Sequence, residues 1–330
     1  MKTVPAAPRR LALPEPRGPL SAHVIEALDG PVRRLEHNPA VTGDALAGDD
    51  FHLALYLCYE VHYADVGDPG WEWEPTLLEL RRELEDAFEK ELVTSLPPAG
   101  GDGDLPARLI ALARSDEGRS LSRYVADDPT FDRMTELVIH RSAYHLKEAD
   151  PHSWAIPRLT GAAKAALVEI QADEYGGGDP AVMHAALFAQ TMRALGLDDT
   201  YGAYLSRLPG ITLATVNLMS MFGLHRRWRA AAAGHLALFE MTSTEPNRRY
   251  GDALRALGFG SEATEFYDEH VEADAVHENI AAYDLAGSLA RDEPDLAPDV
   301  ELGARSLLYL EGQWGEHLMS AWDAGRSSLL

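Results

Sequence analysis

Two histidines and an aspartate stand at a spacing that lets one helix face present them together. His270, Asp274 and His277 occur in the stretch YDEHVEADAVHE, residues 267–278. An α-helix turns by about 100° per residue, so the three side chains lie within roughly 60° of one another around the helix. Imidazole and carboxylate together suit iron or manganese, whereas zinc sites draw mainly on cysteine and histidine. The stripe therefore predicts part of a transition-metal site.

Further candidate ligands precede this stripe in the chain. Glu148 lies at the end of a predicted helix, Glu174 closes another, and His184 lies early in the segment that follows. The three glycines at 176–178 permit backbone turns that other residues resist, so Glu174 and His184 can face one cavity. The resulting three carboxylates and three histidines suit two metal ions better than one. His145, one helical turn before Glu148, remains an alternative ligand from the same helix.

Helical periodicity dominates the chain, and we find no internal repeat and almost no strand alternation. The expected class is all-α, with residues 1–18 as a proline-rich arm and residues 19–330 as one helical domain. The metal-site core of that domain is expected at about 130–290. Asp179 and Pro180 are expected to restart a helix, with aspartate as its N-cap. The predicted helices span 19–30, 44–64, 74–94, 130–149, 161–175, 180–194, 198–207, 211–223, 225–241, 246–257, 261–291 (where a break is left open) and 297–322.

Composition limits the classes of partner. The chain of 330 residues has 53 acidic and 29 basic residues and a formal net charge of −24, which disfavours nucleic acid and anionic membranes. Its single cysteine, Cys58, lies in an apolar segment and is expected to be a buried, inert thiol. The apolar stretch 211–224 is interrupted by polar residues and predicts a buried helix rather than a membrane span. We expect a cytoplasmic protein with no membrane partner.

The order of the candidate ligands matches a known pattern. The segments KEADP, DEYGGGDPAVMH and HVEADAVH give Glu, then Glu-x9-His, then His-x3-Asp-x2-His. This arrangement resembles the heme-oxygenase-like diiron oxidases, also described as the iron-containing redox enzyme family, over roughly residues 130–290. Carried over residue by residue, the resemblance implies six metal ligands, namely Glu148, Glu174, His184, His270, Asp274 and His277.

The resemblance also implies a fold and an activity. The fold would be a heme-oxygenase-like helical bundle with extra helices at both ends. The cofactor would be a nonheme pair of Fe(II)/Fe(III) ions, with manganese or a mixed Mn/Fe pair also compatible, and O2 would be the cosubstrate. The substrate would be a small amine, an amino acid or a fatty-acid-like molecule, changed by N-oxygenation or by oxidative C–C cleavage.

Other residues are candidates for substrate binding. His235 and Glu240 fall on one predicted helix and could line a pocket, and Arg248 belongs to a set of arginines suited to a substrate carboxylate. We find no flavin or pyridine-nucleotide motif, so an external electron donor or reductase is expected. A homodimer is compatible with a helical domain of this size.

Two alternatives stay open at this point. One is a non-catalytic or differently metallated helical binding protein; a ferritin-like bundle would need paired Glu-x-x-His motifs, and the chain has only the Asp-x-x-His of Asp274 and His277. The other is a heme-binding or heme-degrading protein of the same fold, for which His23 or His62 would be the axial ligand.

Overall fold

The computed structural model describes residues 9–99, 103–115 and 118–330, apart from the side chains of Asp274 and Ala275. Helices make up most of this part of the chain, so the all-α prediction is confirmed. The described residues contain no β-strand, and their one extended pairing is an isolated bridge between Arg10 and Asp65.

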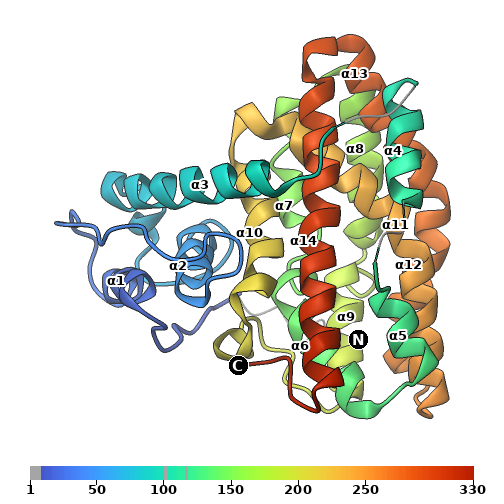
Figure 1. Ribbon diagram of the computed structural model, residues 1–330, viewed down its shortest axis with the longest axis horizontal. Helices are drawn as coiled ribbons and strands as arrows, with labels where there is room; N and C mark the ends of the chain where they lie inside the picture. The colour runs from blue at the N-terminus through green and yellow to red at the C-terminus, as the bar shows by residue number, and fades with distance from the viewer. Residues whose placement is uncertain (1–8, 100–102, 116–117) are drawn as a thin grey trace.

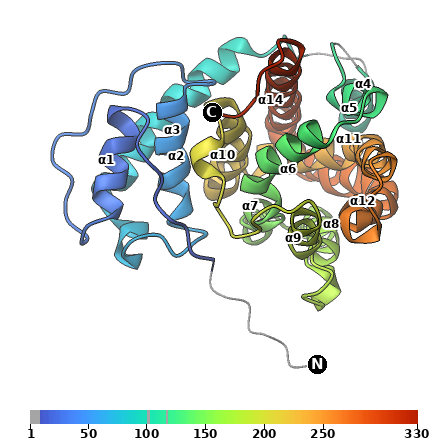
Figure 2. The same cartoon turned by 90° about the horizontal axis from the view of Figure 1, so that it is seen from below.

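The helices form an upright bundle with a smaller group beside it (Figures 1 and 2). The smaller group holds α1, α2 and α3, and α10 lies between α2 and the rest of the bundle. The helices of the smaller group are α1 (Pro19–Leu28), α2 (Asp49–Glu60) and α3 (Pro75–Ser95). Those of the bundle are α4 (Leu105–Arg114), α5 (Leu121–Asp127), α6 (Phe131–His145), α7 (Asp150–Ser153), α8 (Gly161–Glu174), α9 (His184–Ala194), α10 (Gly210–Leu224), α11 (Arg229–Ala256), α12 (Ser261–Asn279), α13 (Ser288–Asp292) and α14 (Ala297–Asp323).

Several predicted boundaries were wrong, each for a local reason. Asp179 does not start a helix; its carboxylate accepts the N–H of Ala181 within a turn at 2.9 Å, and α9 begins at His184 instead. The predicted helix at 198–207 is mostly turn, with one short 3-10 segment at Leu205–Arg207. Helices α4 and α5 were not predicted.

Helix α11 joins two segments that the sequence separates. It runs through Pro246, which lacks the N–H of a helix interior and costs roughly 3 kcal/mol there. Burial of the alanine-rich first half of α11 against its neighbours offsets this cost, since Ala230 to Leu238 are all buried. Helix α12 in turn passes into a π-helix, Ile280–Gly287, before α13, so the break left open in the prediction is a change of helix type.

Helix α10 is the most enclosed element of the fold. Every residue in it except Leu224 is buried, which confirms the buried helix predicted from its apolar sequence. None of the described helices has the length and apolarity needed to cross a bilayer. Cys58 on α2 is also buried, and burial raises the pKa of its thiol to about 12, in agreement with an inert group.

The backbones of α11 and α14 touch where they cross. A Cβ added to Gly234 on α11 would lie 1.9 Å from the carbonyl oxygen of Val300, and one added to Gly303 on α14 would lie 2.0 Å from that of Ala231. Glycine at both positions therefore sets the distance between the two longest helices of the bundle. Because α11 contributes Glu240 to the site described below, this distance also fixes one wall of that site.

We expect Gly303→Ala to destabilise the protein by about 1–3 kcal/mol or more, because the added methyl group must push two backbones apart. Gly312 lies on the same helix with nothing within 4 Å of its added Cβ. Gly312→Ala is therefore the matched control and should be neutral or stabilising by up to about 1 kcal/mol. Urea unfolding of the two variants measures the difference; equal stabilities would contradict the close crossing.

Candidate metal centre

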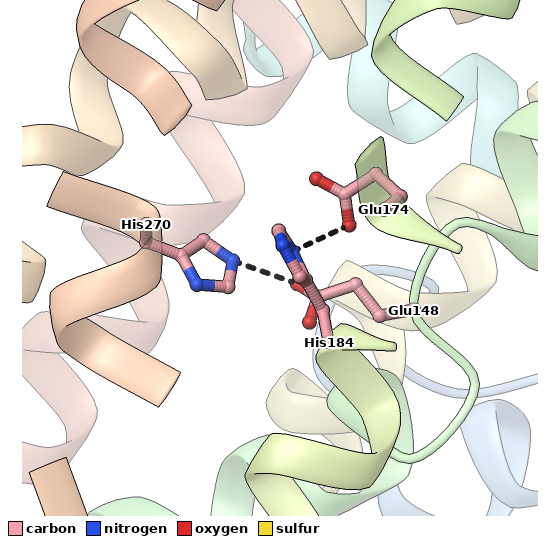
Figure 3. Close-up of side chains that lie close together, drawn as sticks. All are labelled: Glu148, Glu174, His184 and His270. Atoms are coloured by element: carbon pink, nitrogen blue, oxygen red, sulfur yellow. Dashed lines mark ion pairs between the residues drawn. The ribbon is translucent and has the colours of Figure 1, made fainter. Parts of the chain in front are cut away.

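Four buried side chains from separate segments meet in the bundle. One ligand atom from each of Glu148, Glu174, His184 and His270 lies within 4.8 Å of one atom of every other. Figure 3 shows these side chains converging from α8, α9, α12 and the turn after α6. Ligand atoms bound to one ion at about 2.1 Å lie up to about 4.2 Å apart, so small side-chain movements would close this set on a metal.

A second group shares one member with the first. Glu174, Glu240 and His277 also offer ligand atoms within 4.8 Å of one another, and all three residues are buried. Glu174 therefore stands between the two groups, where one carboxylate can bind two cations. Asp274 belongs to α12, but its side chain lies outside the described part of the structure, so its ligand role stays a prediction.

The glycine run explains how Glu174 and His184 come together. All three glycines have positive φ, at 65°, 59° and 92° for Gly176, Gly177 and Gly178. This left-handed backbone reverses the chain so tightly that a Cβ on Gly176 would lie 2.8 Å from the backbone nitrogen of Met183. As a result, the last residue of α8 faces the first residue of α9, and Glu174 Oε2 lies 3.0 Å from His184 Nδ1.

Glu148 reaches the cluster from a turn rather than from a helix. Helix α6 ends at His145, and the turn ends at Ala149, whose φ of 74° lies in the left-handed region. His145 does not take the place of Glu148; its Nδ1 donates a hydrogen bond of 2.7 Å to Glu148 Oε1. His145 thus orients the carboxylate that the cluster uses.

Hydrogen bonds also fix the rings of two other histidines. His270 Nδ1 donates to the carbonyl oxygen of Phe266 at 2.7 Å, so its Nε2 is the nitrogen that faces the cluster, 3.7 Å from Glu148. His277 Nε2 donates to Asp173 at 2.9 Å, so its Nδ1 faces Glu240 at 3.3 Å. Metal-binding histidines commonly donate their other ring N–H in this way, which sets the tautomer and the ring direction.

Several polar atoms of the cluster make no well-aligned hydrogen bond with a described residue. Glu148 Oε2 is one of them. Glu174 Oε2 and His184 Nδ1 face each other at 3.0 Å, and His277 Nδ1 lies 3.3 Å from Glu240, but neither contact has the geometry of a hydrogen bond. Leaving a buried polar atom without a partner costs about 1–3 kcal/mol, and more for a charged group. No described lysine or arginine forms an ion pair with Glu148 or Glu174. Cations bound between the carboxylates and imidazoles would supply the missing partners, so the side chains fit a metal centre.

Without metal, protons stabilise the same arrangement. Burial is the largest influence on the pKa of His184 and lowers it, but the contact with Glu174 and the charge of Glu148 together raise it above its usual value. Burial also opposes the shift of His277, whose close contacts with Glu240 and Asp173 raise its pKa to about 9. A metal binds deprotonated ligands, so ions entering this cluster would displace these protons.

A cavity of about 220 Å³ opens beside the cluster. His145 and His270 lie in its wall, and Phe239, Ser243 and His270 are shared with a smaller cavity at the carboxylates. The charged wall of this cavity was not predicted. There Arg141 and Glu311, 170 residues apart, form a bidentate ion pair at 2.9 and 2.6 Å, and the guanidinium lies 3.9 Å from the centre of the Trp314 ring.

None of the three residues predicted for substrate binding lines the larger cavity. His235 is buried behind the cluster with Nδ1 3.1 Å from His152 Nε2, and it does not line the larger cavity. Glu240 lies in the second ligand group. Arg248 is about half exposed and lies 3.5 Å from Glu245, so it does not line the larger cavity either.

The two histidines considered as heme ligands, His23 and His62, lie in the smaller group of helices or at its edge. His62 Nε2 accepts a hydrogen bond from Arg81 at 2.7 Å, and its Nδ1 lies 3.3 Å from Glu72. Both of its ring nitrogens are therefore engaged. His23 belongs to α1, in the smaller group of helices beside the bundle (Figure 1).

A buried ion pair holds the turn that carries Glu148. Lys147 and Glu60 are fully buried and form an ion pair, and Tyr201 donates its hydroxyl to the second oxygen of Glu60 at 2.7 Å. The ammonium of Lys147 lies 4.3 Å from the centre of the Tyr63 ring. The pair thereby connects the metal cluster to α2, in the smaller group of helices.

The sequence of the chain is similar to sequences of known redox enzymes and of a synthase. The sequence profile of a family described as iron-containing redox enzymes matches residues 135–312, more than half of the chain. Nitrosourea synthase from Streptomyces achromogenes subsp. streptozoticus is 23% identical over 211 residues, which cover 63% of this chain and 42% of that protein. The chain thus spans less than half the length of this relative. Both clusters of candidate ligands fall within the matched range 135–312.

We expect Glu60→Leu to destabilise the protein by about 3–5 kcal/mol, because it leaves the buried Lys147 ammonium without its counter-charge. Glu60→Leu combined with Lys147→Met should recover most of that loss, since no buried charge is left uncompensated. Asp86→Asn, in an exposed pair with Arg82, is the control and should change stability by less than about 1 kcal/mol. Chemical unfolding checks all three, and a double variant no more stable than Glu60→Leu would contradict the ion-pair argument.

Proposed function

Because the chain belongs to the iron-containing redox enzyme family, whose heme-oxygenase-like all-α fold it shares, we propose that it is a nonheme diiron oxidoreductase that uses O2. Family membership makes it an oxidoreductase. The number of irons, the use of O2 and the substrate are our inferences. The observation that carries them is the pair of buried ligand groups joined by Glu174.

The two groups divide the ligands between two ions. Glu148, His184 and His270 would hold one iron, and Glu240 and His277 would hold the other. Glu174 would bridge both ions, and its negative charge would reduce their mutual repulsion. We propose Asp274 as a further ligand of the second ion, on the sequence pattern alone. Glu240 is better explained as a metal ligand than as the substrate contact expected from the sequence, because it lies against His277 in the cluster.

When bound, the iron pair would supply the electrons and open coordination positions that O2 reduction requires. The protein's own part is to hold the carboxylates and imidazoles in place and to exclude bulk water, since every described residue of both groups is buried. For N-oxygenation of an amine, one oxygen atom enters the substrate and the other leaves as water. This consumes two electrons and two protons beyond the amine and O2, so we propose a separate reductase or chemical reductant as the donor.

The larger cavity is our candidate substrate site, because it reaches His270 at the metal cluster. Its volume of about 220 Å³ suits a small molecule. The Arg141–Glu311 pair leaves that wall formally neutral, while the two groups can still offer hydrogen bonds to a polar substrate. The name of the nitrosourea synthase relative favours chemistry at nitrogen, so we propose N-oxygenation of a small amine or amino acid over C–C cleavage of a fatty acid.

We expect about two irons per chain after anaerobic loading with Fe(II), and a transient visible absorption band after mixing with O2. Glu174→Ala should reduce iron content to below about one per chain, because both ions lose a shared ligand. Glu169→Ala, an exposed residue on the same helix, is the matched control and should bind iron like the wild type. Metal analysis and stopped-flow absorbance are the measurements.

The outcome against the proposal would be one tightly held zinc ion per chain together with no spectral response to O2. Full iron content in Glu174→Ala would separately contradict the shared carboxylate. Addition of heme provides a further check, since a nonheme diiron site should give no Soret shift on mixing.

A further inference from the structure

A second, much smaller cavity lies directly at the carboxylates of the metal cluster. Its volume is about 10 Å³, close to the space needed for one water molecule. Glu148, Glu174 and Glu240 line it on the cluster side. Two other buried polar side chains, His152 and Gln171, line it as well, and neither lines the larger cavity.

Gln171, which lines this small cavity, has an amide nitrogen that is unpartnered within the described part of the chain. The hydroxyl of Ser153 donates to Gln171 Oε1 at 2.9 Å, which fixes the direction of the amide. Gln171 Nε2 has no hydrogen-bond partner among the described residues, although the side chain is 2% exposed. A buried amide donor is thus held in position and left without an acceptor beside three carboxylates.

His152 also lines the small cavity and also has a nitrogen that no described side chain partners. Its Nε2 lies 3.1 Å from His235 Nδ1, and its own Nδ1 has no hydrogen-bond partner among the described residues. Burial lowers the pKa of His152 to about 4 and that of His235 well below its usual value, so the two rings form a neutral pair that shares one N–H.

The surroundings decide which tautomer this pair adopts. Carboxylate oxygens around the cavity accept hydrogen bonds and repel lone pairs. The favoured arrangement has His235 Nδ1–H donating to His152 Nε2, which leaves an N–H on His152 Nδ1. This nitrogen is then a second unpartnered donor at the same cavity.

We propose that His152 Nδ1 and Gln171 Nε2 form a donor pair that binds a small oxygen-bearing or anionic ligand of the metal centre, with His235 and Ser153 as positioning residues. The proposal rests on the proposed function, because the ligand would be held between the metal ions and the two N–H groups. The small cavity borders the larger one at Phe239, Ser243 and His270, but its volume of about 10 Å³ is too small for the organic substrate. Water, hydroxide and O2 have a suitable size.

Azide is a suitable probe, because it is a small anion that binds open positions on ferric iron and gives a visible band. In the oxidised, iron-loaded full chain, His152→Leu and Gln171→Leu should each weaken azide binding about ten-fold, with iron content unchanged. His152→Asn should retain most of the affinity, since the Asn amide nitrogen can reach the place of Nδ1. The measurements are azide titration by absorbance and iron content per chain.

His140→Asn is the control, because His140 is an equally buried histidine that contacts Thr212 and Ser328 instead of the cluster. It should leave azide affinity unchanged. Equal azide affinity in the wild type and both leucine variants, at full iron content, would overturn the donor pair. Loss of iron from the leucine variants would also overturn it, because it would show that these side chains support the metal ligands directly. A wild type that binds no iron would instead contradict the proposed function.

Discussion

Three buried carboxylates at one point of the bundle need positively charged partners, and this need constrains the rest of the structure. Glu148, Glu174 and Glu240 are buried beside one another, where negative charges are poorly screened and need cations or protons as partners. Histidines supply part of that partnership, and two of them are oriented by Phe266 and Asp173 so that one ring nitrogen faces the carboxylates. A pair of iron ions would complete it. The buried carboxylates destabilise the fold when no cation is bound, and they can bind cations that enter. This combination is typical of a metal centre.

The fold brings these groups together by local devices that act on each segment separately. Three glycines with positive φ reverse the chain between α8 and α9, and a left-handed residue, Ala149, ends the turn that carries Glu148. The Lys147–Glu60 ion pair fixes that turn against α2. On the other side, backbone contact between α11 and α14 sets the position of the helix that bears Glu240. A change in the backbone of any one of these segments would move ligands away from the cluster, because the ligands come from distant parts of the sequence.

The parts of this arrangement that depend on local pattern could be predicted from the sequence. The seven-residue spacing of His270 and His277 predicts a shared helix face, and the glycine run marks a turn between Glu174 and His184; the structure has both features. The all-α class follows from periodicity alone. By contrast, the expected helix start at Asp179 failed because an aspartate can cap a turn as well as a helix.

Features that depend on how helices pack could not be predicted in this way. Glu240 could be placed on a helix but not against His277, because the crossing of α11 and α12 is set by side chains spread over both. The same holds for the Arg141–Glu311 pair and for the neighbouring donors His152 and Gln171.

The most direct test of the account is anomalous diffraction at the iron edge from crystals loaded with Fe(II) without oxygen. We predict two iron peaks about 4 Å apart, both within bonding distance of Glu174, with His184 and His270 on one ion and His277 on the other. A single peak, or iron bound away from Glu174, would contradict the shared carboxylate on which the account depends.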